Sequence, residues 1–310
     1  MGSKSFAERI TAVAGRMRAN FGRVLAIISG RKKRSVNFVD PLRPGQRPQD
    51  LLAILLLTVG IAVVTLDIPT YPWIRSLPGE YRATFAAFTD LGKAHWILWS
   101  TGLVCLFLLA QQAKKFTFRL RMATGAIFTY AGFVFYSVAA TGILAIIFKW
   151  SLGRARPKLY EQVGPVHFDF MALHGAYTSF PSGHSTTIGA LAMALSLIFP
   201  AYRWLIVVIC FWVAFSRVMV GAHFPSDVIA GVLLGMTFTY FTGRALARRR
   251  LGFAYNKDGG IEPIMSTRSA KVCMRAVWNV VTGRRRATRF EPSGDNGKVP
   301  AAGKSDAGTP

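Results

Sequence analysis

The sequence predicts an all-α protein, a polytopic membrane helical bundle with six transmembrane helices. Composition is the first reason: 52% of the 310 residues are hydrophobic and 17% are charged, whereas a soluble domain carries about 25% charge. The second reason is the formal net charge of +24, with basic residues flanking apolar runs. This pattern fits an integral membrane protein better than a nucleic-acid-binding protein, whose basic residues gather on a compact soluble face.

Six apolar runs are the third reason, because each approaches the roughly 20 residues that a membrane-spanning helix needs. They lie at 51–68, 94–111, 122–148, 185–200, 203–220 and 227–243. The short link FPAYR joins the fourth run to the fifth and predicts a helical hairpin. Glycines inside the runs, as in GILAIIF and AGVLLG, favour close helix packing in lipid.

The orientation of the bundle follows from its lysines and arginines, because 30 of the 38 fall on one side of the predicted spans. The positive-inside bias therefore predicts that both termini are cytoplasmic. The predicted organisation is a basic amphipathic arm over 1–49, a six-span domain over 50–245 and a basic tail over 246–310. The small polar residues beyond 291 predict disorder at the end of the tail.

The N-terminal arm places apolar residues at helical spacing with arginines between them. The apolar positions are Phe6, Ile10, Val13, Met17, Phe21, Val24, Leu25 and Ile28. One interpretation is a helix on the inner leaflet that binds anionic lipids. The other is an ordinary surface helix packed on the protein. Residues 270–290 show a weaker version of the same pattern.

Three polar clusters interrupt the apolar runs. KWSLGRARP closes the third span, PSGH opens the fourth, and SRVMVGAHFPSD connects the fifth to the sixth. With cytoplasmic termini, the parity of the spans places all three clusters at the outer, periplasmic face. A charged residue in a membrane segment is costly unless it is used or paired. A single such residue is often a structural partner, but three clusters at one face predict a site.

The residue types in these clusters suit a phosphate group. Lys149, Arg156 and Arg217 supply positive charge, and the arginine fork matches phosphate oxygens. Ser182 and Gly183 lie at a helix start, where free N–H groups favour an anion.

Two histidines and one carboxylate complete the predicted chemistry. His184 and His223 can act as one nucleophile and one general acid. Asp227, four residues after His223, can orient its imidazole and stabilise the imidazolium. No carboxylates have metal-ligand spacing, so we expect no metal and no other cofactor, with the cations taking the role that Mg²⁺ has elsewhere.

The motifs KX6RP, PSGH and SRX5HX3D resemble the three signatures of the type 2 phosphatidic acid phosphatase superfamily, in its integral-membrane lipid phosphatase branch. The resemblance covers roughly residues 50–245. It implies a phosphohistidine on His223, oriented by Asp227, with His184 protonating the leaving oxygen. It also implies a group that binds the phosphoryl oxygens: Lys149, Arg156, Ser182, Gly183 and Arg217. Arg154 is an extra cation that could contact a second phosphate, a headgroup or an outer-leaflet lipid.

The expected substrate is a phosphate or pyrophosphate monoester of a membrane lipid in a bacterial inner membrane. Candidates are lipid A phosphate, undecaprenyl pyrophosphate, phosphatidylglycerophosphate and phosphatidic acid, with the first two favoured by the resemblance. The loop 158–180 is expected to select the headgroup, with His167 and His174 as ordinary loop residues. Alternatives are a lipid-to-lipid phosphotransferase, a non-enzymatic lipid transporter or scaffold, and a haloperoxidase. The sequence leaves the oligomeric state open.

Overall fold

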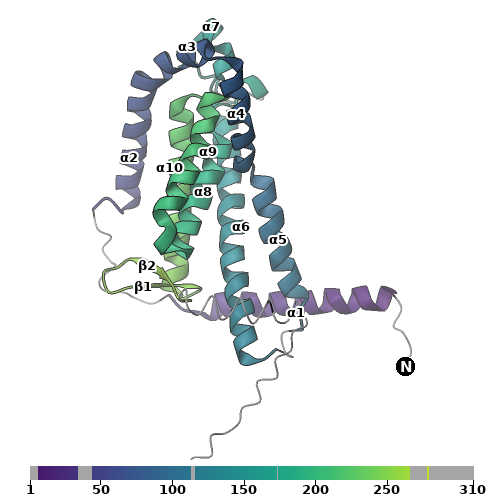
Figure 1. Ribbon diagram of the computed structural model, residues 1–310. Coiled ribbons are helices and arrows are strands. Elements are labelled where there is room, and N and C mark those ends of the chain that lie inside the picture. The colour runs from purple at the N-terminus through teal and green to yellow at the C-terminus, as the bar shows by residue number, and fades with distance from the viewer. Residues whose placement is uncertain (1–5, 34–43, 113–115, 173, 266–277, 279–310) are drawn as a thin grey trace, which may run out of the picture.

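The computed structural model describes residues 6–33, 44–112, 116–172, 174–265 and 278. It is a bundle of long helices with a crosswise helix and a small hairpin at one end (Figure 1). Five segments are long and apolar enough to cross a membrane: Pro48–Ser76, Gly79–Ala110, Phe118–Leu152, Pro200–Met219 and Pro225–Arg248. The predicted all-α membrane bundle is therefore confirmed. The sixth apolar helix, α8, has 16 residues and is shorter than a full span.

The first spanning segment bends at its outer part. It consists of α2 (Pro48–Ala62), a π-helical turn η1 (Val63–Asp67) and α3 (Ile68–Ser76). The segment runs along the bundle as α2 and then crosses over its end as α3 (Figure 1). A π-turn inside an α-helix is rare and often lies at a functional site. The predicted span 51–68 corresponds to α2 and η1.

The second spanning segment is interrupted in the middle. It consists of α4 (Gly79–Thr89), the 3₁₀ turn η2 (Asp90–Gly92) and α5 (Ala94–Ala110). The predicted span 94–111 matches α5 alone. Charged residues within GEYRATFAAFTD hide α4 from a search for apolar runs. Lys93 and Asp90 form an ion pair of 2.7 Å at the interruption.

The long helix α6 (Phe118–Leu152) leads to the polar cluster KWSLGRARP at the end of the bundle that α3 crosses (Figure 1). It ends at Gly153, whose φ of 60° is in the left-handed region. A Cβ on this residue would lie 1.6 Å from the carbonyl oxygen of Asp169, so only glycine fits. The loop that follows contains η4 (Pro157–Leu159), α7 (Tyr160–Val163) and η5 (Gly175–Tyr177).

Three helices complete the bundle: α8 (Gly183–Ile198), α9 (Arg203–Met219) and α10 (Pro225–Arg248). Only the short turn η6 (Pro200–Tyr202) separates α8 from α9, which confirms the predicted hairpin. Helices α8 and α10 are in backbone contact, because a Cβ on Gly235 would lie 2.2 Å from the carbonyl oxygen of Thr186. Such an approach needs a residue without a side chain.

The opposite end of the bundle contains the N-terminal helix α1 (Phe6–Gly30) and an antiparallel hairpin of β1 (Phe253–Tyr255) and β2 (Ile261–Pro263). Helix α1 lies across the direction of the spanning helices (Figure 1). Its Asn20 donates hydrogen bonds to the carbonyl oxygens of Leu109 and Gln111, at 2.7 and 3.0 Å. The predicted tail, 246–310, therefore starts within the last turn of α10 and continues into the hairpin. The expectations for 270–290 and beyond 291 lie outside the described residues, apart from position 278.

Candidate active site

The structure brings the three predicted clusters together at the end of the bundle away from α1 and the hairpin (Figure 1). The backbone N–H of Ser182 donates to the carbonyl oxygen of Asp227 at 3.0 Å, which joins the start of α8 to the start of α10. A Cβ on Gly183 would lie 3.5 Å from Nζ of Lys149, so the end of α6 reaches the same place. Residues more than 70 positions apart in the sequence thus form one site.

Helix α8 begins at the site with its N-terminus capped. The Oγ of Ser182 accepts from the backbone N–H of Ser185 at 3.4 Å and from its hydroxyl at 2.9 Å. Ser182 is fully buried, whereas Gly183 is only partly buried. The first turn of a helix leaves N–H groups without intrahelical partners, and the helix dipole favours an anion there.

Two arginines enter the site with unused donors. Arg156 donates from Nη2 to Oγ1 of Thr178 at 3.1 Å, and Arg217 donates from Nη1 to Oγ1 of Thr89 at 2.9 Å. The Nε of each arginine is buried and has no hydrogen-bond partner among the described residues. Buried donors without acceptors are rare in folded proteins, and a bound anion is the group that would satisfy them.

His223 is buried, and its Nδ1 lies 3.7 Å from Oδ2 of Asp227. This distance is too long for a hydrogen bond, and Nδ1 has no other partner in the described part of the chain. Burial lowers the pKa of His223 to about 4, against the opposing effect of the Asp227 carboxylate. The imidazole is therefore neutral near pH 7, which is the form that a nucleophile requires.

His184 follows Gly183 in the first turn of α8 and is partly buried. It packs on η2, because a Cβ on Gly92 would lie 3.3 Å from its Cβ and Cδ2. Burial, followed by the positive charges of Arg217 and Lys149, lowers the pKa of His184 to about 4 in the free protein. The predicted acid and the predicted nucleophile thus share one electrostatic environment.

Arg154 does not have the place that the sequence suggested. Its side chain is fully buried, and it forms ion pairs with Asp227 at 2.6 Å and with Asp67 at 2.7 Å. The expected contact of Arg154 with a headgroup or lipid is therefore wrong, because its guanidinium binds two carboxylates inside the protein.

Sequence reasoning missed several polar partners of the site. They are Asp67, Thr89, Thr178, Ser179 and Ser226. Asp67 alone had a visible signal, because it is the one acidic residue in the apolar run LLAILLLTVGIAVVTLDI. Of the two loop histidines, His174 accepts from the backbone N–H of Ala176 at 3.3 Å, and His167 lies against Tyr177.

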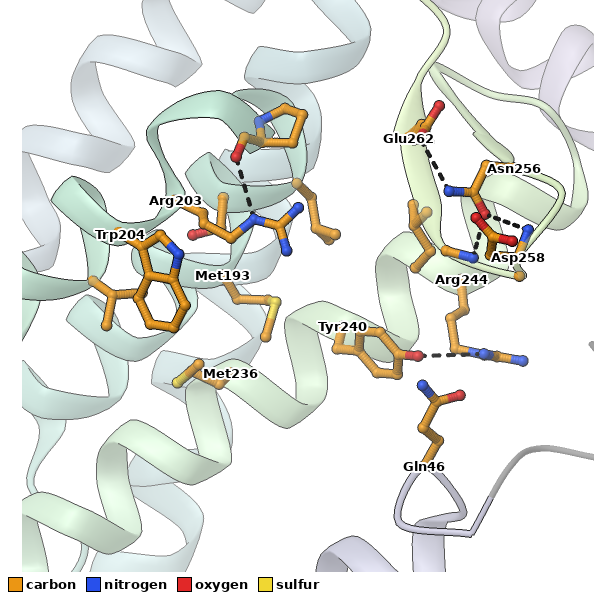
Figure 2. Close-up of a pocket in the computed structure, with 17 residues that line it drawn as sticks. Gln46, Met193, Arg203, Trp204, Met236, Tyr240, Arg244, Asn256, Asp258 and Glu262 are labelled. Carbon is orange, nitrogen blue, oxygen red and sulfur yellow. Dashed lines mark hydrogen bonds between the residues drawn. The ribbon is translucent and has the colours of Figure 1, made fainter.

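A cavity of about 640 Å³ lies at the other end of the bundle, between α8, α9, α10 and the hairpin. Figure 2 shows Arg203, Trp204, Tyr240 and Arg244 around it. None of the predicted site residues lines this cavity. Among the described residues, no three His, Cys, Asp or Glu side chains are grouped to hold one metal ion.

Comparison with known proteins gives matches to one family and to several membrane phosphatases. A sequence model of the PAP2 superfamily matches residues 130–251. The lipid A 1-phosphatase of Rhizobium johnstonii is 34% identical over 218 residues, which cover 70% of this chain and 88% of that protein. An undecaprenyl-diphosphatase of Sulfolobus acidocaldarius is 33% identical over 101 residues, 32% of this chain and 47% of that protein. A transmembrane PAP2 type phosphatidylglycerolphosphate phosphatase from Bacillus subtilis has a TM-score of 0.44 and 20% identity, covering 63% of this chain and 92% of its own.

The apolar helices, the superfamily match and the lipid A 1-phosphatase relative together show an integral-membrane phosphatase. The chain belongs to the PAP2 superfamily, which is the type 2 phosphatidic acid phosphatase superfamily that its motifs resemble.

Proposed function

We propose that this chain removes a phosphate from a lipid at the periplasmic face of a bacterial inner membrane, through a phosphohistidine and without a metal. The observation that supports this proposal most directly is the set of buried donors that lack acceptors. Nε of Arg156 and Nε of Arg217 enter the site from different elements. A phosphoryl group presents several anionic oxygens at once and so can accept from both.

The proposed first step forms a phosphohistidine. Nε2 of His223 attacks phosphorus, the P–O bond to the lipid breaks, and the imidazolium form of His184, which the anionic phosphoryl group stabilises, donates its proton to the leaving oxygen. His184 then takes a proton from water, the water oxygen attacks phosphorus, and the P–N bond breaks to release phosphate. The non-bridging oxygens are held by Lys149, Arg156, Ser182, Gly183 and Arg217.

Lipid A phosphate is the first candidate substrate. The Rhizobium johnstonii relative is named for that substrate and is aligned over most of its own length. Undecaprenyl pyrophosphate is the second candidate, because the relatives named for it align over a shorter segment. The exposed side chains of Val166, Phe170 and Met171 lie in the loop after α7 and could contact an acyl chain or headgroup.

The orientation rests on the positive-inside pattern, with the site end outside and both termini cytoplasmic. Helix α1 would then lie on the inner leaflet, where its arginines meet anionic lipids and its exposed Phe6, Ile10 and Phe21 enter the interface. Cysteine labelling tests this orientation, because a cysteine at exposed position 170 should react with an impermeant reagent from the periplasmic side. Reaction from the cytoplasmic side alone would overturn it.

A lipid-panel assay tests the activity. Detergent-purified protein with EDTA present should release phosphate from at least one of the four candidate lipids. The His223→Asn variant should lose release by at least ~10³-fold, the scale for removing a catalytic nucleophile. His174→Asn is the matched control, because this exposed loop histidine lies outside the proposed machinery, and it should retain activity. No release by wild type on any lipid, or full activity in His223→Asn, would refute the hydrolase proposal. Transfer of labelled phosphate to a second lipid would indicate a phosphotransferase instead.

A further inference from the structure

The carboxylate of Asp67 is fully buried at the end of η1, yet the proposed mechanism does not use it. Its Oδ2 accepts from Nη2 of Arg154 at 2.7 Å and from the hydroxyl of Ser226 at 2.5 Å. Its Oδ1 accepts from the backbone N–H of Ser226 at 3.0 Å. Asp67 thus joins the first spanning segment to the start of α10. We call Asp67, Arg154, Ser226 and Asp227 the Arg154 cluster.

The guanidinium of Arg154 has no unused donor. Its Nη1 donates to Asp227 and to Ser226, both at 2.6 Å, and its Nη2 donates to Asp67 and to the carbonyl oxygen of Pro165, both at 2.7 Å. Its Nε also donates to Pro165, at 3.2 Å. The aromatic ring of Phe224 lies 4.8 Å from the guanidinium carbon. Arg154 therefore has no donor left for a substrate. Any effect of the cluster on catalysis has to act through another residue.

That other residue is His223. The Oδ1 of Asp227 accepts from Arg154, while its Oδ2 lies 3.7 Å from Nδ1 of His223. If Arg154 faced Asp227 alone, the two charges would cancel. Asp67 adds a second carboxylate, so with both carboxylates ionised the cluster as a whole has one net negative charge beside the imidazole. When Nε2 of His223 attacks phosphorus, positive charge develops on the ring, and a negative neighbour stabilises it.

We propose that Asp67 is a positioning residue of the active site, which balances Arg154 so that Asp227 stays negative toward His223. This inference rests on the proposed function. Asp67 lies outside residues 130–251, the part that matches the superfamily model. The first spanning segment would thus contribute to the chemistry without contacting substrate.

The Asp67→Asn variant tests the role of the negative charge on Asp67. The amide keeps the shape of the side chain and an oxygen that can accept from Ser226. We expect kcat to fall by about 10- to 100-fold, the range for residues that support a catalytic group from outside. We expect KM to change little, because Asp67 does not face the substrate. Asp50→Asn is the matched control, since Asp50 is on α2 of the same segment and far from the cluster.

The pH profile separates an electrostatic role from a structural one. The groups that act on His223 are Asp227 from α10, Lys149 from α6, Arg217 from α9 and His184 from α8. Loss of one negative charge makes the imidazolium less favourable, so the acid limb of kcat/KM should move to lower pH in Asp67→Asn. Ser226→Ala removes the hydroxyl's hydrogen bonds with Asp67 and Arg154 but no charge, so its acid limb should stay in place.

The outcomes are distinct. An inactive wild type would refute the proposed function itself. An active wild type with a folded Asp67→Asn variant whose kcat is unchanged would overturn the inference. So would a lower kcat with an unmoved acid limb, because that result indicates a purely structural role. If Asp67→Asn is not recovered folded, Asp67→Ser is a smaller neutral variant with the same expected shift, and Asp67→Glu should keep the wild-type limb.

Discussion

Arg154 and Arg156 lie two residues apart in one loop, but the structure uses them in opposite ways. Arg154 is fully buried and gives every guanidinium donor to a protein acceptor. Arg156 is partly buried, binds Thr178, and has an Nε without a partner among the described residues. The first belongs to the closed Arg154 cluster. The second belongs to the set that we propose binds the phosphoryl oxygens, here called the open group: Lys149, Arg156, Ser182, Gly183 and Arg217. We therefore propose that unused donors, rather than charge, distinguish a ligand-binding arginine from a structural one.

Replacing each arginine by methionine should give the largest contrast. Arg154→Met leaves two buried carboxylates without their cation, which costs about 3–5 kcal/mol when one partner of a buried pair is removed. Arg156→Met removes a donor that has little to do in the free protein, so stability should change little. Its phosphate release should fall by about 10²- to 10³-fold, as for loss of one oxyanion donor. Thermal unfolding in detergent and a phosphate assay measure the two effects.

The contrast would break down if both variants lost stability equally, because Arg156 would then also be a structural residue. It would break down equally if Arg154→Met unfolded at the wild-type temperature. Either result would mean that the hydrogen bonds of an arginine in the free protein do not predict whether it stabilises the fold or binds substrate.

A second difference concerns pH, because His223 is buried and neutral between the closed cluster and the open group. Burial lowers its pKa from the ordinary value of 6.5 to about 4. Above the unfolded pKa the imidazole is neutral in both states and has no effect on the pH dependence of folding. As pH falls from 6.5 toward 4 the unfolded state binds the proton first, so the free energy of unfolding decreases, by at most on the order of 3 kcal/mol.

The Tm of the wild type should therefore be lower at pH 5 than at pH 7.5, and the Tm of His223→Asn should decrease by less over the same interval. The neighbouring His184 is present in both proteins, so the difference between them isolates His223. Equal losses in the two proteins would show that another group dominates the acid sensitivity.

The same contrast explains how far the sequence could predict the site. The motifs and the parity of the spans placed Lys149, Ser182 and Asp227 at one end, because a membrane allows few arrangements of connected helices. The sequence could not predict that Arg154 is paired with Asp67, since their partnership depends on the bend at η1. It also missed α4, because charged residues within that element interrupt the apolar pattern. The sequence thus predicted which residues lie at this end of the bundle, but not which side chains pair with one another there.

Ser182 gives the prediction with the smallest expected effect. It contacts Asp227 of the Arg154 cluster and also belongs to the proposed phosphate-binding residues. Its hydroxyl caps α8 and receives a hydrogen bond from Ser185, while its backbone binds Asp227 and its position is in the proposed phosphate-binding motif. Loss of an N-cap hydroxyl costs about 1 kcal/mol. We expect Ser182→Ala to lower stability by that amount and to lower phosphate release as well.

Ser185→Ala is the matched control, since it removes the hydroxyl that donates to Ser182 but keeps the cap. Its stability should fall by less than that of Ser182→Ala, and its phosphate release should stay near the wild-type rate. If the two variants lost activity equally, the hydroxyl of Ser182 would act by holding the helix start in shape. If only Ser182→Ala lost activity, the Ser182 hydroxyl would both cap α8 and contact the substrate. One atom would then serve the stability of the helix and the binding of phosphate.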